Sequence, residues 1–291
     1  MQASVVDPPG GPEALVVREA PAPAPGPGEV LVRVTAAGIN RADLMQRRGH
    51  YPPPQGASPL LGLEIAGVIE TPAAGVTVWA RGERVMALLP GGGYAELAAV
   101  PAGMLMRIPD GLSDAEAAGI PEAWLTAFLN LFWLGDLKAG ETALIHAGGS
   151  GVGTAAIQLA KAAQARVFTT ASAGKCERCR ALGADLALDY AAGPFAEPVL
   201  AATGGRGADL ILDFIGEPYV EQNLGAIAPD GRWIVLSTLG GRQAPLDLGR
   251  LMQKRVRLAG STLRPLAPAR KVALTQAFAQ FALPRFASGT H

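Results

Sequence analysis

The sequence predicts an α/β protein in which a β-rich, barrel-like first part is followed by a doubly wound parallel sheet. Short β-branched runs separated by Gly, Pro and Asp turns fill the first 120 residues. Strand-like and helix-like segments then alternate to about residue 260, as in parallel sheets with crossover helices. A glycine-rich turn joins the first strand and helix of this second part.

Composition limits the classes of function. The 291 residues are 49% hydrophobic and carry 25 basic and 25 acidic side chains, so no net charge attracts nucleic acid or an anionic membrane. The sequence has neither the ~18-residue apolar run of a membrane span nor the pattern of a signal peptide. With only two cysteines, a disulfide framework is excluded and we expect a cytoplasmic protein.

The first part contains three clear strand candidates and one helix candidate. Strands are predicted at residues 30–34, 67–69 and 84–89, and a helix at 40–48. Residues 20–28 alternate Pro with Ala or Gly, which predicts an extended connector. We expect one β-rich domain over residues 1–120.

The second part begins with two expected helices and continues as an alternation of strands and helices. The expected helices are 114–120 and 121–134, then a helix from 151, one ending at 182, and 219–227. The expected strands are 142–146, 166–170, 186–189, 209–214, 233–236 and 256–259. This order predicts a second domain over residues 121–260. Residues 261–291 are too few for a further domain and contain a predicted helix at 271–281.

The turn after the first parallel strand carries glycines at positions 148, 149, 151 and 153. Glycines let the backbone approach a pyrophosphate, and the following helix N-terminus stabilises its negative charge. Because Thr154 occupies the third position, the spacing departs from the strict G-x-G-x-x-G pattern. The context still predicts dinucleotide binding. The alternative is a plain tight turn.

The end of the next strand should select the cofactor. A site for NAD usually offers a carboxylate there, whereas this strand ends with Ser172 and Lys175 and no acid before Glu177. A hydroxyl and an ammonium group can bind a 2′-phosphate, so the segment favours NADPH over NADH. The alternative is a solvent-facing Ser and Lys at a helix start.

The Cys and His residues do not form a metal-binding pattern. Cys176 and Cys179 lie inside a predicted helix without a second ligand pair, and His146 ends a strand, where we expect it to be hydrogen-bonded. The remaining histidines are His50 and the terminal His291. We predict no metal site.

Several stretches together resemble one known family. They are Asn-Arg-Ala-Asp-Leu-Met-Gln-Arg (40–47), Leu-Gly-Leu-Glu (61–64), Ala-Leu-Leu-Pro-Gly-Gly-Gly (87–93), Ile-Pro-Glu-Ala-Trp-Leu-Thr-Ala-Phe (120–128), Ser-Gly-Val-Gly-Thr-Ala-Ala-Ile-Gln (150–158), Leu-Ile-Leu-Asp-Phe-Ile-Gly (210–216) and Asp-Gly-Arg-Trp (230–233). The chain resembles zeta-crystallin-like quinone oxidoreductases, in particular their tumour-suppressor-inducible branch. This branch belongs to the zinc-independent medium-chain dehydrogenases/reductases.

The resemblance implies a GroES-like catalytic domain at 1–120, a Rossmann domain at 121–260 and a return to the catalytic domain at 261–291. Zinc-dependent relatives carry Gly-His-Glu where this chain has Gly62-Leu-Glu64, and a Cys where it has Asn40. Both departures fit the metal-free branch. The family continues past Arg285-Phe-Ala-Ser-Gly-Thr-His291 with further strand and helix, so we expect apolar surface of the catalytic domain to be uncovered.

The resemblance also implies a set of site residues. Tyr51, Asn40 and Ser150 are the catalytic candidates, and the Tyr51 hydroxyl is the candidate that hydrogen-bonds the acceptor oxygen. Asn40 could instead only cap its helix, and Tyr51 could only pack. The cofactor-binding residues expected are, beside the nicotinamide, Asn40, Tyr51 and Thr126; at the pyrophosphate, Gly148, Ser150, Gly151, Val152 and Gly153; at the adenosine phosphate, Ser172, Lys175 and Tyr190; and along the ribose and nicotinamide wall, Ile215, Gly216, Ser237 and Leu239.

The function implied is hydride transfer from NADPH to a quinone, an ortho-quinone in particular, without a metal. Residues 256–259 resemble the edge strand through which relatives pair, so we expect a homodimer. One alternative is an NADPH-dependent enal or enone reductase. Another is a non-catalytic NADPH-binding or RNA-binding protein, although the neutral charge disfavours RNA.

Overall fold

The computed structural model describes residues 1–72 and 75–289, which divide into two compact units. The first unit comprises Met1–Leu125 together with the segment that starts at Arg264, and the second comprises Thr126–Leu263. The chain thus completes the second unit before it returns to the first. His291 lies outside the described residues.

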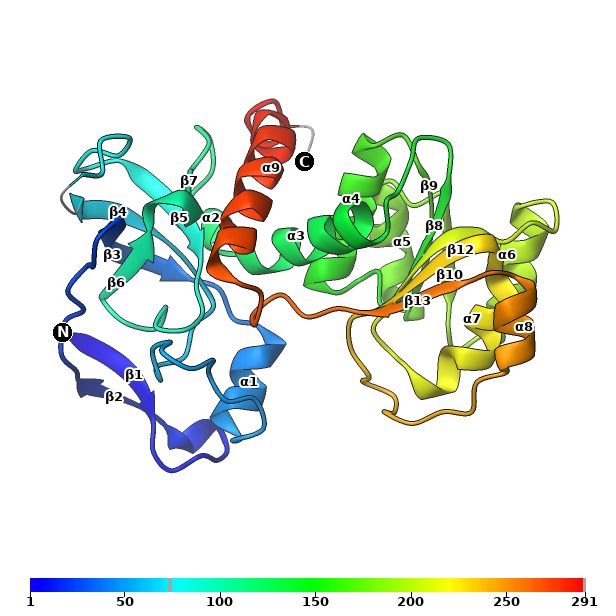
Figure 1. The fold of residues 1–291 in the computed structure, drawn as a ribbon, viewed down its shortest axis with the longest axis horizontal. Coiled ribbons are helices and arrows are strands. Elements are labelled where there is room, and N and C mark those ends of the chain that lie inside the picture. Colours follow the sequence, from blue (N-terminus) through cyan, green and yellow to red (C-terminus); the bar gives the residue numbers. More distant parts are fainter. Residues whose placement is uncertain (73–74, 290–291) are drawn as a thin grey trace. The chain divides into compact units, whose positions relative to one another are not determined.

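The first unit is built on a five-stranded sheet in the order β6-β3-β4-β5-β7, with every neighbouring pair antiparallel (Figure 1). A separate hairpin pairs β1 with β2. One face of the sheet is apolar, and Val30, Val32, Ile65 and Val85 are buried there. The strands are β1 Gln2–Val6, β2 Leu15–Glu19, β3 Glu29–Ala37, β4 Glu64–Pro72, β5 Arg84–Leu88, β6 Leu97–Pro101 and β7 Leu105–Arg107.

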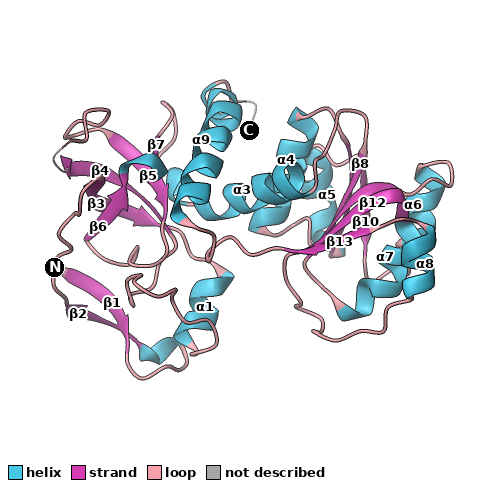
Figure 2. Ribbon diagram, in the orientation of Figure 1, coloured by secondary structure: helices cyan, strands magenta, loops and turns pink. Residues whose placement is uncertain are grey.

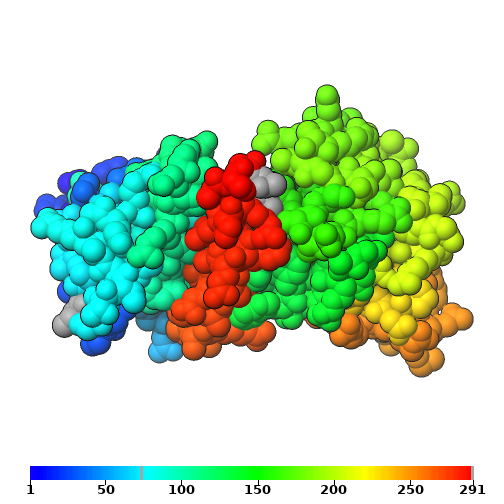
Figure 3. Space-filling view, turned by 90° about the horizontal axis from the view of Figure 1, so that it is seen from above, coloured from blue at the N-terminus to red at the C-terminus, as the bar shows by residue number. Residues whose placement is uncertain are grey.

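Four helices accompany this sheet in the described part of the first unit, and the third leads on to the second unit. They are α1 Arg41–Arg47, α2 Asp114–Ala118, α3 Pro121–Phe128 and α9 Pro268–Ala287, with 3₁₀ turns at Pro12–Ala14 and Ala102–Met104. Helix α9 is longer at both ends than the predicted 271–281. It starts earlier because proline is tolerated in a first helical turn. It lies at the surface of the first unit (Figure 3), and its buried face repeats every four residues through Leu274, Phe278 and Ala282.

The second unit is a six-stranded parallel sheet in the order β10-β9-β8-β11-β12-β13. This is the doubly wound order in which the chain reverses direction next to the first strand. Helices lie on both sides of the sheet (Figure 2). The elements are β8 Thr142–Ile145, α4 Gly151–Ala162, β9 Arg166–Ala171, α5 Ala173–Ala181, β10 Leu186–Asp189, α6 Ala196–Ala202, β11 Ala208–Asp213, α7 Val220–Ala226, β12 Ile227–Val235, α8 Leu248–Gln253 and β13 Arg257–Gly260, with a 3₁₀ turn at Glu217–Tyr219.

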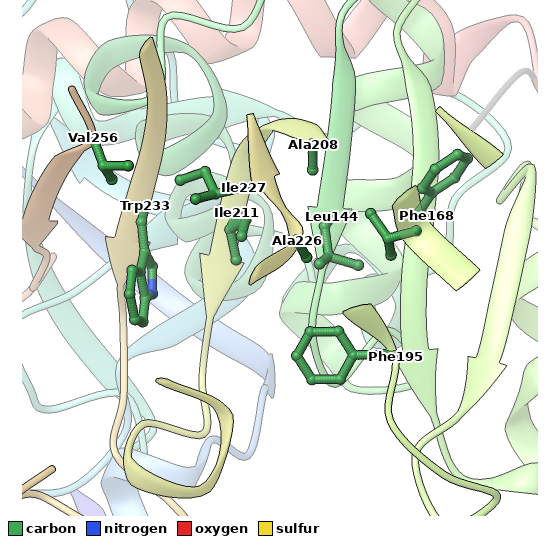
Figure 4. Packing of buried hydrophobic residues seen from close by; sticks show 10 residues of the cluster. Leu144, Phe168, Phe195, Ala208, Ile211, Ala226, Ile227, Trp233 and Val256 are labelled. Atoms are coloured by element: carbon green, nitrogen blue, oxygen red, sulfur yellow. The ribbon is translucent and has the colours of Figure 1, made fainter. Parts of the chain in front are cut away.

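The core of the second unit lies between this sheet and its helices. Leu144, Ile211 and Trp233 project from three different strands into one cluster that also contains Phe168 and Phe195 (Figure 4). Each of these five side chains is at most 2% exposed. Continuous apolar strands are expected where helices cover both faces of a parallel sheet.

Within the predicted second part, residues 121–260, two elements differ from the observed ones by more than two residues or in the type of helix. Strand β12 begins at Ile227 instead of 233, because Ile227 already pairs with Ala208 ahead of a register shift. The predicted helix 121–134 is α-helical only to Phe128 and continues as a π-helix over Leu129–Leu134. Single π turns occur mostly as insertions in α-helices, and hydrophobic periodicity does not reveal them.

Strand β13 lies at one edge of the parallel sheet, where the sequence placed its edge strand. Pairing of two copies along this edge stays a prediction. Among the described residues, none of the helices combines the length and apolar character needed to cross a bilayer.

We expect the α9 segment to be an integral part of the first unit. Phe278 is fully buried, and its ring centroid lies 6.5 Å from that of Trp124. Phe278→Ala should lower the free energy of unfolding by about 3–5 kcal/mol, because it leaves a cavity. Exposed Gln276→Ala on the same helix should change it by less than ~0.5 kcal/mol. Chemical denaturation measures both, and equal small effects would contradict this role of α9.

Candidate functional site

The connection from β8 to α4 forms the centre of the site in the second unit. Ser150 is the N-cap of α4, and its hydroxyl oxygen accepts a hydrogen bond from the Gly153 N–H at 3.1 Å. Ala147 adopts a positive φ of 50°, which turns the chain sharply out of the strand. The observed role of the Ser150 side chain is therefore to cap the helix.

Two glycines of this turn are required by packing. A Cβ atom at position 148 would lie 1.8 Å from the Thr169 hydroxyl oxygen, and one at position 153 would lie 2.3 Å from the Ala147 carbonyl oxygen. The turn therefore sits directly on β9, and α4 starts against the turn. A Cβ at position 149 would meet only the flexible side chain of Lys175, at 2.5 Å.

A cavity of about 440 Å³ opens beside this turn, at the carboxyl ends of the parallel strands. Such a cavity, beside the point where strand order reverses, is where doubly wound folds bind ligands. The residues that line it are Ala147, Gly149, Ser150, Ala171, Ser172, Lys175, Tyr190, Ile215, Tyr219, Leu239 and Gly240. Six predicted cofactor residues are among them: Ser150, Ser172, Lys175, Tyr190, Ile215 and Leu239.

The cofactor-selecting segment follows β9. Ser172 is the N-cap residue of α5, and Lys175 lies in its first turn. Lys175 and Tyr190 are exposed on the cavity side of the fold, whereas Glu177 is exposed farther along α5 and does not line the cavity. The cavity thus presents the Lys175 ammonium and the Ser172 and Tyr190 hydroxyl groups. Among the described residues, no carboxylate, which would repel a phosphate, lines it. These residues fit a dinucleotide with an additional phosphate.

The other predicted cofactor residues of the second unit do not line the cavity. Gly151, Val152 and Gly153 form the first turn of α4, and Gly148 packs on β9. Gly216 follows Ile215 with a φ of 82°, and its N–H is bound by the Asp213 carboxylate at 3.0 Å. The Ser237 N–H reaches the Asp213 carbonyl oxygen at 3.4 Å. Thr126 is half-buried in α3 and accepts, through its carbonyl oxygen, a hydrogen bond from the Asn130 amide.

Asn40 and Tyr51 belong to the first unit. Asn40 precedes α1, and its backbone N–H binds the Asp43 carboxylate, which confirms the expected capping position. Its side-chain amide instead donates to Glu64 at 2.7 Å. Tyr51 is half-buried, and the Arg264 guanidinium lies 5.1 Å from the centre of its ring.

Sequence reasoning missed a group of carboxyl groups around Asn40. One Glu64 oxygen accepts from Asn40, and the other accepts the Glu122 N–H at the start of α3, at 2.8 Å. Asp43 accepts from the Tyr94 hydroxyl at 3.0 Å and from the Gly62 N–H at 3.1 Å. These partners are between 19 and 58 residues apart in the chain, so local patterns could not bring them together.

Burial controls the ionisation of this group. Desolvation raises the pKa of Glu64 to about 7, although the hydrogen bonds from the Glu122 N–H and the Asn40 amide act to lower it. Desolvation and the neighbouring Glu64 and Asp43 raise the pKa of Glu122 to about 8. Burial likewise raises the pKa of Tyr51, although Arg264 opposes this shift. Carboxyl groups that keep a proton near neutral pH are suited to proton transfer.

The metal-binding chemistry of zinc-dependent relatives does not fit these side chains. Within residues 1–72 and 75–289, no three His, Cys, Asp or Glu side chains are grouped so as to hold a metal ion. Asn40 already donates to Glu64, and an amide N–H is not a zinc ligand. The ring of His146 is buried and hydrogen-bonded at both nitrogens, as the sequence led us to expect.

Comparison with known families agrees with both units. Residues 26–110 match the alcohol dehydrogenase GroES-like domain, and residues 151–280 match a domain described as zinc-binding dehydrogenase. The chain is 37% identical to the quinone oxidoreductase of Thermus thermophilus, solved with and without NADPH, and the alignment covers 98% of this chain and 87% of that one (TM-score 0.80). The chain belongs to the medium-chain dehydrogenase/reductase superfamily.

The chain is also similar to enoyl reductases and to segments of polyketide synthases. The CurK enoyl reductase is 27% identical, with 100% of this chain and 89% of that chain covered (TM-score 0.87). The polyketide synthase Pks15/1 of Mycobacterium bovis is 44% identical over 180 residues, which are 61% of this chain and 8% of that synthase. The chain spans about a tenth or less of the length of the curated relatives it matches. The match to these two domain families confirms the fold predicted from the sequence, a GroES-like domain and a Rossmann domain.

The raised pKa values predict a stability that falls with pH. An unfolded glutamate ionises near its ordinary pKa of 4.5, whereas folded Glu64 and Glu122 keep their protons to about 7 and 8. The folded state therefore binds more protons between about pH 5 and 8, and the free energy of unfolding should decrease as pH rises through this range. Glu122→Gln, which has no proton to lose, should flatten the decrease.

Denaturation at several pH values measures this dependence. Exposed Glu197→Gln, a matched control in the second unit, should follow the wild type. A wild-type stability that rises from pH 5 to 8 would contradict the assignment of protonated carboxyl groups.

Proposed function

We propose that the protein is an NADPH-dependent reductase that transfers a hydride to a quinone. The observation that carries this proposal is the cavity at the end of β8 and β9, where Ser172, Lys175 and Tyr190 meet without a carboxylate. The cavity, the capped helix N-terminus and the superfamily all support a nicotinamide cofactor. The similarity to a quinone oxidoreductase solved with NADPH supports the choice of cofactor and acceptor.

The residues of the chain hold and orient the reactants. The first turn of α4, residues 151–153, would bind the pyrophosphate, and Lys175 with Ser172 would bind the 2′-phosphate. NADPH, when bound, supplies two electrons as hydride. Reduction of a quinone to its hydroquinone then takes up two hydrogens, one as hydride and one as a proton. The Tyr51 hydroxyl is our candidate for hydrogen-bonding the acceptor oxygen, and water can supply the proton.

A second candidate function is reduction of an activated C=C bond. The similarity to polyketide synthases over 180 residues, and to an enoyl reductase over the whole chain, supports it. The same hydride donor serves both reactions, so the acceptor must be found by assay.

The acceptor assay should separate these two functions. We expect NADPH oxidation to be fastest with an ortho-quinone, and at least ten times slower with an enal or an enoyl thioester. Steady-state values of kcat/KM over this panel give the ratio. Faster turnover of the enoyl substrates would favour the second function, and no turnover of any acceptor would contradict both.

The preference for NADPH depends on Lys175. A charge-assisted contact to phosphate contributes roughly 1.5–3 kcal/mol, so Lys175→Ala should weaken NADPH about ten- to a hundredfold. NADH binding should barely change, because NADH lacks that phosphate. Arg178→Ala, an exposed change on the same helix, is the matched control and should leave both Kd values within about twofold. Equal losses of NADPH and NADH, measured by fluorescence titration, would contradict this role.

Metal independence is a further expected property. The donor set of the described residues does not fit zinc, so activity should survive exhaustive dialysis against a chelator. Elemental analysis of the active protein should find less than one zinc in ten chains. A stoichiometric zinc whose removal abolishes activity would contradict the expected metal independence.

A further inference from the structure

Arg264 is the first residue of the segment that returns to the first unit, and it is only 6% exposed. Its guanidinium ties this segment to other parts of the unit. Nε and Nη2 donate to the Pro90 carbonyl oxygen at 2.9 and 2.7 Å, and Nη2 also donates to Gln46 Oε1 of α1 at 2.8 Å. Nη1 donates to the Tyr51 carbonyl oxygen at 3.5 Å. Because the donors of a guanidinium have a fixed, planar arrangement, they hold these segments in one geometry.

The same guanidinium lies over one face of the Tyr51 ring. Its central carbon is 5.1 Å from the ring centre, within the ~6 Å over which a cation is attracted to an aromatic face. Arginine does not lose its proton in proteins. A permanent positive charge therefore covers one side of the Tyr51 ring.

The two tyrosines of the first unit differ in what their hydroxyl groups bind. Tyr94 donates to the Asp43 carboxylate at 3.0 Å. Within the described part of the chain, no hydrogen bond occupies the Tyr51 hydroxyl, because the Arg264 bond goes to the Tyr51 backbone. The Tyr51 hydroxyl is therefore available to a ligand.

Burial and two charges act on the Tyr51 phenol. Burial raises its pKa, the Arg264 guanidinium lowers it, and Glu122 raises it. The net pKa is above its usual value, so the hydroxyl keeps its proton at neutral pH. Arg264 acts against burial because a nearby cation stabilises the negative charge that develops on a phenol oxygen when its O–H donates strongly.

We propose that Arg264 is a positioning residue for reduction of the acceptor, and that it acts through the Tyr51 hydroxyl. This inference rests on the proposed function, in which Tyr51 hydrogen-bonds the acceptor oxygen. When hydride reaches a quinone, negative charge develops on that oxygen, and a fixed donor stabilises it. Arg264 holds the Tyr51 ring, and its charge strengthens the O–H donor. The proton that completes the hydroquinone comes from water, so Tyr51 keeps its own.

Two substitutions separate the charge of Arg264 from its fork of donors. Arg264→Met removes both, whereas Arg264→Lys keeps a positive charge and loses the paired contact with Pro90. Arg264→Met should lower kcat for an ortho-quinone about three- to tenfold. Arg264→Lys should keep about half or more of the wild-type kcat, although denaturation should show a similar loss of stability in both variants. An equal loss of kcat in both would overturn the inference.

The control for these variants is Arg270→Met, an exposed change on α9 of the same segment. It should leave kcat and the KM for NADPH within about twofold of the wild type. Arg264→Met should also leave the KM for NADPH unchanged, because Arg264 is assigned to the acceptor. A KM for NADPH that rises as much as kcat falls would overturn this assignment.

The double variant Arg264→Met/Tyr51→Phe decides whether Arg264 acts through Tyr51. Tyr51→Phe alone should lower kcat about tenfold, the loss of one charge-assisted hydrogen bond. The kcat of the double variant should equal that of Tyr51→Phe, whereas a merely structural role of Arg264 predicts that the two losses multiply. Unchanged kcat in Tyr51→Phe would overturn the inference even if Arg264→Met fails to fold.

A second measurement needs no acceptor. The chain has four tyrosines, which can be replaced by 3-fluorotyrosine and followed by fluorine NMR, with Tyr51→Phe identifying the Tyr51 signal. Arg264→Met should raise the pH at which the Tyr51 signal titrates, because the cation that stabilises the phenolate is gone. Tyr190 and Tyr219 of the second unit should titrate as before. An unchanged Tyr51 titration would overturn the inference.

The kinetic results also separate this inference from the proposed function. A wild type that reduces no acceptor would contradict the proposed function, and the role of Arg264 with it. A wild type that reduces the quinone, with Tyr51→Phe equal to it, would contradict the role of Arg264 alone.

Discussion

The close packing of the 147–153 turn against β9 is the constraint on which the second unit depends. No side chain fits at position 148 or 153, because a Cβ there would overlap Thr169 or the Ala147 carbonyl oxygen. Only with glycine at both positions can β8, the turn and α4 meet β9 as they do. The glycines therefore build the fold first, and the cavity beside Ser150 and Lys175 results from that packing.

The two units contribute different chemistry. The second unit offers donors to phosphate at the carboxyl ends of its strands. The first unit buries Glu64 and Asp43 beside Asn40, next to the half-buried Glu122, and desolvation raises the pKa values of all three carboxyl groups. In zinc-dependent relatives the position of Asn40 is a Cys, whereas here it is an amide that binds Glu64. A carboxyl group held in this way stabilises the start of α3 through the Glu122 N–H.

The sequence was sufficient to predict the parallel sheet and half of the cavity, for a physical reason. Carboxyl ends of parallel strands meet at one edge, so Ser150, Ser172, Lys175 and Tyr190 had to approach each other once the strands were recognised. Tyr219 and the carboxyl groups around Asn40 could not be found in this way. Their positions depend on side-chain contacts such as His146 with Tyr219, 73 residues apart (219 − 146), which follow no local period.

The central claim is that the second unit binds NADPH at this cavity. Hydrogen exchange of the free and NADPH-saturated protein tests it most directly, because bound ligand slows the exchange of the backbone amides it covers. We predict slower exchange in segments 149–152, 172–175 and 215–219, which carry the cavity walls. NADH at saturation should protect 149–152 while protecting 172–175 less. Absence of protection in these three segments, or protection confined to the first unit, would contradict the account.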